Sequence, residues 1–156
     1  MRQVERYLDQ AQWTAVLEFI ETLPQAGRRE RQHYERARWV VRFLYDTALR
    51  VSEAAQVILS IAGRAEDCLT PTAVYLIVKD AFGQTADALG ESDPVTAAVL
   101  RRASTHWLRH TAASHQADSG TDLPHIQKNL RHASIETTAI YLHTTDDARH
   151  RDTTGR

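Results

Sequence analysis

Cysteine, lysine and long apolar runs are all scarce in this 156-residue chain. Its one cysteine, Cys68, has no partner for an internal disulfide, which fits a protein of a reducing compartment. A single thiolate is also too few for a structural zinc site made of cysteines. No stretch approaches the roughly 20 consecutive apolar residues of a membrane span, and residues 1–10 do not form a signal-peptide pattern. We therefore expect a single soluble, intracellular globular unit.

The chain also has no excess of positive charge. The formal net charge is −1 at pH 7, and only Lys79 and Lys128 among the 19 basic residues are lysines. Affinity for DNA comes largely from cationic side chains that displace counterions, so this balance argues against binding by charge alone. The charges are unevenly spread, however, with a balance of +4 over residues 28–50 and −5 over residues 51–98. The arginines of the first segment fit a solvated helix face and a DNA-contacting face about equally well.

Signals for extended strands are scarce, and apolar residues recur at helical spacing through most of the chain. Residues 52–61 fit either a helix or a strand, and residues 91–94 are expected to form a loop. Thr70 with Pro71 predicts a helix start, and Gly120 predicts a helix end. The pattern predicts a mainly α fold, with helices over residues 3–23, 28–49, 72–89, 106–119, 122–130 and 135–143.

Histidine, arginine and tyrosine gather in the last third of the chain. His106 and His110 are four residues apart and share a helix face, but no carboxylate or cysteine completes a zinc ligand set. Taken alone, Tyr141 fits a core or interface position, and Arg50 fits a charge at the C-terminal end of a helix. We expect Trp107, next to His106, to be a core residue, as we do its neighbour at position 108, Leu108.

Three strings in order nevertheless resemble the boxes of the tyrosine recombinases, the phage integrase family. They read TALRVSE at residues 47–53, HWLRHT at residues 106–111 and LRHASIETTAIYLH at residues 130–143. Residues 71–82 and 120–130 are similar to connecting segments of that family. The resemblance implies one integrase-like catalytic domain over residues 1–145, built as a helical bundle with its small β-sheet reduced or missing. A polar tail would occupy residues 146–156.

The resemblance implies DNA strand cleavage and rejoining in site-specific recombination or in integration of a mobile element. Tyr141 would attack the scissile phosphate and form a 3′-phosphotyrosyl link, which conserves bond energy, so no cofactor is expected. Arg50 and Arg109 would bind the phosphate through their planar guanidinium groups. His106 would assist proton transfer at the tyrosine, and His132 would hydrogen-bond a phosphate oxygen.

The implied partner is double-stranded DNA, in a cytoplasmic protein associated with the nucleoid. A homo-oligomer on DNA is also implied, because recombinases often exchange a C-terminal segment between protomers. No small-molecule substrate, metal ion or membrane is expected. Weaker DNA contacts are expected from Arg101, Arg102, Lys128 and Arg131.

Three features depart from the family pattern. The family places a general-acid lysine on a β-hairpin, whereas residues 54–70 are too short for that hairpin and contain no lysine. Arg64 is the basic residue in this gap, and arginine is a poor acid because its pKa exceeds about 12. Arg131 stands where the family commonly has glycine, and we expect the N-terminal core-binding domain to be absent.

These departures leave several interpretations open. One is an active recombinase, and another is a catalytically impaired DNA-binding or interaction remnant of an integrase. DNA relaxation by a topoisomerase-like cycle uses the same tyrosine chemistry. An unrelated helical protein with chance motifs would place the side chains of the three strings on separate surfaces.

Overall fold

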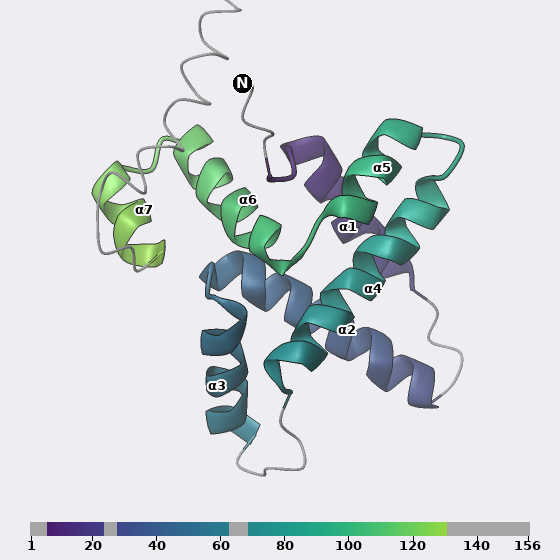
Figure 1. The fold of residues 1–156 in the computed structure, drawn as a ribbon, viewed down its shortest axis with the longest axis horizontal. Coiled ribbons are helices and arrows are strands. Elements are labelled where there is room, and N and C mark those ends of the chain that lie inside the picture. The colour runs from purple at the N-terminus through teal and green to yellow at the C-terminus, as the bar shows by residue number, and fades with distance from the viewer. Residues whose placement is uncertain (1–5, 24–27, 63–68, 131–156) are drawn as a thin grey trace, which may run out of the picture.

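The computed structural model describes residues 6–23, 28–62 and 69–130. This part of the chain consists of helices and contains no strand, which confirms the mainly α prediction (Figure 1). The predicted helix over residues 135–143 and the predicted tail over residues 146–156 lie outside the described residues. The helices are α1 (Gln10–Thr22), α2 (Arg28–Thr47), α3 (Val51–Ala62), α4 (Pro71–Leu89), α5 (Pro94–Arg102), α6 (Thr105–Asp118) and α7 (Leu123–Leu130).

Helix α1 begins later than the apolar spacing predicts, because a capping box fixes its start. The Asp9 side chain accepts a hydrogen bond from the backbone N–H of Gln12 at 2.8 Å. In return, the Gln12 side chain accepts from the backbone N–H of Asp9 at 3.1 Å. The predicted helix over residues 3–23 was therefore wrong at residues 6–9, which are not helical, and its residues 3–5 lie outside the described part of the chain.

Helices α4 and α5 each begin with a side-chain cap that is followed by proline. Thr70 accepts from the backbone N–H of Ala73 at 3.1 Å and is followed by proline, as predicted. Asp93 accepts from the backbone N–H of Thr96 at 2.9 Å and is also followed by proline. The first start was predicted and the second was not, although both follow the rule that an oxygen-bearing cap precedes proline at the first helical position.

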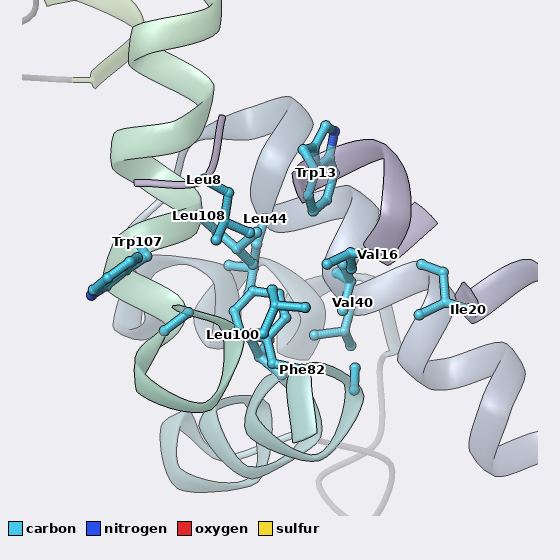
Figure 2. Close-up of a cluster of buried hydrophobic side chains, with 14 of the residues drawn as sticks. Leu8, Trp13, Val16, Ile20, Val40, Leu44, Phe82, Leu100, Trp107 and Leu108 are labelled. Atoms are coloured by element: carbon cyan, nitrogen blue, oxygen red, sulfur yellow. The ribbon is translucent and has the colours of Figure 1, made fainter. Parts of the chain in front are cut away.

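Helix α4 lies at the centre of the described structure and packs against α1, α2, α3, α5 and α6. Figure 2 shows the main core, to which α4 contributes Phe82, α5 contributes Leu100 and α2 contributes Leu44. Trp107 and Leu108 of α6 are 9% and 0% exposed, so their prediction as core residues is confirmed. The ambiguous stretch over residues 52–61 lies within helix α3, and its residues 54, 55 and 58 are buried at helical spacing.

A second, smaller core joins the last described helix to the rest. Ala112, Ala113 and Ala117 of α6 pack with Ile126 and Leu130 of α7, and the same cluster includes the alanine that follows α2. Gly120, between α6 and α7, has φ +83°, which confirms it as a left-handed residue past a helix end. Among the helices that the structure describes, none is both long and apolar enough to cross a membrane.

Candidate active site

The first predicted arginine, Arg50, lies in the short link between α2 and α3. Ala48 ends α2 with φ +51°, a left-handed conformation that turns the chain. The Arg50 carbonyl accepts from the backbone N–H of Ala54 at 2.8 Å, and its own N–H donates to Glu53 Oε2 at 2.9 Å. Arg50 therefore stands at the N-terminus of α3, where the helix dipole does not favour a cation. Its position does not support the interpretation as a charge at a helix C-terminus.

The Arg50 side chain is exposed to solvent. Its guanidinium group contacts the carboxylate of Glu53, with 3.4 Å between Nη1 and Oε1. The arginine side chain in this pair is 54% exposed. Pairs of this kind contribute only about 0–1 kcal/mol, so the guanidinium group can leave Glu53 for another anion.

The second predicted arginine, Arg109 of α6, is in contrast 5% exposed. Its Nη1 donates to the carbonyl oxygen of Ala48 at 2.5 Å, and its Nη2 donates to the carbonyl oxygen of Leu130. Each carbonyl precedes a predicted site residue by two positions, Arg50 in one case and His132 in the other. Arg109 thus joins the two segments that carry the first and third strings of the resemblance. Its predicted phosphate contact stays a prediction.

His106 and His110 form a close pair on α6. Their Nε2 atoms are 2.7 Å apart, and the ring planes are inclined at 81°. The pKa of His106 lies below its ordinary value because of burial and, secondly, because of the nearby positive charges of Arg109, Arg6 and Arg50. No group of three potential metal ligands occurs in the described ranges.

These interactions bring Arg50, His106 and Arg109 to one region, although the three come from two separate strings. Figure 1 shows the geometric reason, because α6 lies beside the end of α2 from which the link to α3 departs. His132, Tyr141 and Arg131 lie outside the described residues, so their convergence on this region stays a prediction.

The predicted weaker DNA contacts that can be placed are on the surface. Arg101 pairs with Asp87 at 3.0 Å, and both side chains are exposed. Arg102 and Lys128 are also exposed, at the end of α5 and on α7. Contact of these residues with DNA stays a prediction.

Two arginines of the basic segment bind within the protein. Arg38 donates from Nε to the carbonyl oxygen of Ile20 at 2.7 Å and from Nη2 to that of Leu23 at 3.2 Å. Arg42 forms an ion pair with Glu21 at 2.5 Å. Both arginines therefore connect α2 to the C-terminal half of α1, so their positions have a structural explanation that involves no DNA.

Lys79 of α4 has a role that the sequence analysis missed. Its ammonium group donates to the carbonyl oxygens of Arg101 at 2.9 Å and Ala103 at 2.8 Å. These carbonyls lie at the C-terminal end of α5, where helical carbonyls lack partners within the helix. Lys79 thus stabilises the chain just before the HWLRHT string. The sequence offered one general signal for this role, because the last carbonyls of any helix need hydrogen-bond donors from elsewhere.

A second histidine environment also escaped the sequence analysis. The hydroxyl group of Tyr45 and Nδ1 of His115 are 2.9 Å apart, and the Tyr45 ring stacks on Trp13 with ring centroids 4.3 Å apart. Burial lowers the pKa of His115 and raises that of Tyr45. Through these contacts Tyr45 connects α1, α2 and α6.

Comparison with known proteins gives several matches. The sequence model of the phage integrase family matches residues 71–148, which is half of the chain. The tyrosine recombinase XerC of Listeria innocua is 30% identical over 152 residues, covering 72% of this chain and 51% of that protein. The XerC of Listeria monocytogenes serovar 1/2a is 30% identical over 154 residues with the same coverage. The XerC of Corynebacterium efficiens is 55% identical over 40 residues, which are 26% of this chain and 13% of that protein.

The chain spans about half the length of the Listeria relatives. The 152 aligned positions outnumber the residues in 72% of a 156-residue chain, so the alignment contains gaps in this chain. No solved structure matches it. The family model and the three ordered strings agree on one conclusion: the chain belongs to the phage integrase family.

Proposed function

We propose that this chain takes part in site-specific recombination by cleaving and rejoining DNA, with Tyr141 as nucleophile and a 3′-phosphotyrosyl intermediate. The observation that carries this proposal is the convergence of Arg50, His106 and Arg109. Attack of a tyrosine on a phosphodiester is helped by cations beside the phosphate and by a proton acceptor beside the tyrosine. Negative charge on the nonbridging oxygens must be stabilised while a proton leaves the tyrosine.

The two arginines are suited to different parts of this task. Arg50 is exposed and held by a weak surface ion pair, so a DNA phosphate can replace Glu53 as the partner of its guanidinium group. Arg109 is buried and keeps the Arg50 link in place through the Ala48 carbonyl. Its charge stabilises an anion in the same region from below the surface.

His106 is suited to accept the tyrosine proton. Its pKa is lowered by burial and by Arg109, Arg6 and Arg50, so the imidazole is neutral at pH 7. A neutral imidazole accepts a proton, and an imidazolium ion does not. The proton from the Tyr141 hydroxyl would therefore move to His106 as the tyrosine oxygen bonds to phosphorus.

A second candidate function follows from the leaving 5′-oxygen, for which the chain lacks the family's general acid. Lys79 is bound to two backbone carbonyls, and Lys128 is the other lysine of the chain. A chain without the family's general acid would bind DNA and cleave it slowly or not at all. The second candidate is thus a catalytically impaired DNA-binding remnant of an integrase.

A suicide substrate distinguishes the two candidates. The full chain is incubated with nicked duplexes that contain a randomised central sequence, and covalent protein–DNA adducts are separated on denaturing gels. The proposed function predicts an adduct that Tyr141→Phe abolishes. Tyr75→Phe is the matched control, since Tyr75 is an exposed tyrosine on α4 and should leave the adduct unchanged.

A bridging 5′-phosphorothiolate in the same duplex tests the missing general acid. Its sulfur leaves without protonation, so an adduct on this substrate but not on the normal one indicates that only the acid is missing. DNA binding that weakens linearly on a log–log plot against salt, with no adduct on either substrate, would support the remnant. No binding and no adduct would contradict both candidates.

A further inference from the structure

The two histidines of the HWLRHT string are paired through the same kind of nitrogen. The Nε2 atoms of His106 and His110 are 2.7 Å apart, and the ring centroids are 4.3 Å apart. Two ring nitrogens at this distance share one proton, because two N–H groups would repel and two lone pairs would not attract. One imidazole therefore donates from Nε2 and the other accepts at Nε2.

Burial distinguishes the two rings. The His106 ring is only partly shielded from solvent, and His110, one turn further along the same helix, is the more buried of the two. No described residue forms a hydrogen bond with Nδ1 of His106. If His106 donates from Nε2 to His110, its Nδ1 carries a lone pair directed away from the pair.

We propose that His110 is a positioning residue for His106, accepting its Nε2–H and so holding Nδ1 of His106 as the proton acceptor of the cleavage step. This inference rests on the proposed function and assigns a role to a residue outside the predicted catalytic set. In the step, the proton of the Tyr141 hydroxyl moves to Nδ1 of His106. The tyrosine oxygen bonds to phosphorus as the bond from phosphorus to the 5′-oxygen breaks.

The pair also accounts for the charge produced in this step. When His106 gains a proton at Nδ1, its Nε2–H becomes a stronger donor, and the hydrogen bond to His110 strengthens. The groups that face His106 are Arg109 of the same helix, Arg6 of the N-terminal segment and Arg50 of the α2–α3 link, all positive. His110 thus offers an acceptor nitrogen to a ring that has positive charges on its other sides. In this arrangement it would fix the tautomer of His106, as the third group of a catalytic triad orients the base.

Nitrogen NMR of the free protein tests the pairing without any DNA. Two-bond ¹H–¹⁵N spectra of the labelled full chain report which ring nitrogen carries the proton. The wild type should show His106 protonated at Nε2, and His110→Ala should convert it to a mixture of tautomers. His125→Ala is the matched control, because His125 is an exposed histidine on α7 and should leave the His106 signals unchanged.

Single-turnover cleavage of the nicked duplex then tests the consequence. His110→Ala should reduce the cleavage rate at saturating DNA by roughly ten- to a hundredfold, the loss typical when a partner that orients an imidazole is removed. DNA affinity should stay the same, and His110→Gln, whose side-chain carbonyl can accept the same hydrogen bond, should restore most of the rate.

The two measurements keep the proposals separate. An unchanged His106 tautomer in His110→Ala overturns the pairing, whether or not the wild type cleaves DNA. A changed tautomer together with an unchanged cleavage rate overturns the positioning role. A changed His106 tautomer in His110→Ala, together with a wild type that forms no adduct, confirms the pairing and contradicts the proposed function instead.

Discussion

Arg109 shows how much structure one buried side chain can hold together. A buried guanidinium group must have hydrogen-bond partners, and this one binds two backbone carbonyls from segments far apart in the sequence. The carbonyls depend on Arg109 in turn, since a buried acceptor left unpaired costs about 1–3 kcal/mol.

We therefore predict that Arg109→Lys lowers the free energy of unfolding by about 1–3 kcal/mol, although it conserves the charge. An ammonium group lacks the planar fork that reaches two carbonyls at once. Urea denaturation at pH 7 measures the change. Arg102→Lys is the control, because Arg102 is exposed at the end of α5 and its replacement should stay within about 0.5 kcal/mol. Equal losses in the two variants would contradict the role given to Arg109.

Among the elements, α5 depends on α4 for the termination of its last turn. Lys79 donates to the carbonyls of Arg101 and Ala103, and hydrogen bonds that involve a charged group contribute about 1.5–3 kcal/mol. The link from α5 to α6 begins at these carbonyls, so this contact also determines where the HWLRHT string begins.

Lys79→Met keeps the aliphatic part of the side chain and removes both donors. We predict a loss of about 1.5–3 kcal/mol in the free energy of unfolding, measured by urea denaturation. We also predict that the variant exchanges the amide hydrogens of residues 101–103 faster than the wild type does, and that this increase exceeds any increase in α4. Lys128→Met, at the other lysine of the chain, should change neither quantity. Protection of residues 101–103 equal to that in the wild type would show that Lys79 is not their anchor.

The elements also show what sequence reasoning could reach. Thr70 with Pro71 and Gly120 were sufficient for their helix boundaries, because a cap, a proline and a left-handed glycine act locally. Helix α5 was missed because it is only nine residues long, too short for apolar periodicity to be recognised. The start of α1 was missed because Val4 and Leu8 extend the apolar spacing past the capping box at Asp9.

The site was predictable to a similar extent. The resemblance of the TALRVSE and HWLRHT strings to the tyrosine recombinase boxes indicated Arg50, His106 and Arg109, and the i, i+4 relation placed His106 and His110 on one face of a helix. Spacing could not show that Arg109 is buried or that the two imidazole rings meet, since both depend on tertiary packing and side-chain rotamers. The contact of Lys79 was hidden for the same reason, because it requires the packing of α4 against α5.

For the whole molecule, the histidines make stability depend on pH. The pKa of His115 and that of His106 lie below the value of 6.5 expected when unfolded, mainly because burial disfavours the charged forms. Between the folded and unfolded pKa values the unfolded chain binds more protons, so stability rises with pH in this window. The stabilisation is complete above pH 6.5 and declines as the pH falls below it.

We predict that the urea midpoint of the wild type decreases when the pH is lowered from 7.5 to 5.5. His115→Gln should make this decrease smaller. Glutamine does not titrate and can still hydrogen-bond the Tyr45 hydroxyl. His125→Gln replaces an exposed histidine and should retain the wild-type dependence. The assignment fails if His115→Gln and the wild type lose equal stability over this range.

The bonds that Arg109 makes also bear on how this chain can diverge. It recognises residues 48 and 130 only through carbonyl oxygens, which every amino acid carries. As far as these bonds are concerned, mutation is neutral at two of the three positions and selection acts on the arginine alone. The connection can therefore survive any substitution at residues 48 and 130 that the second core accepts, because the backbone oxygens that Arg109 binds stay in place.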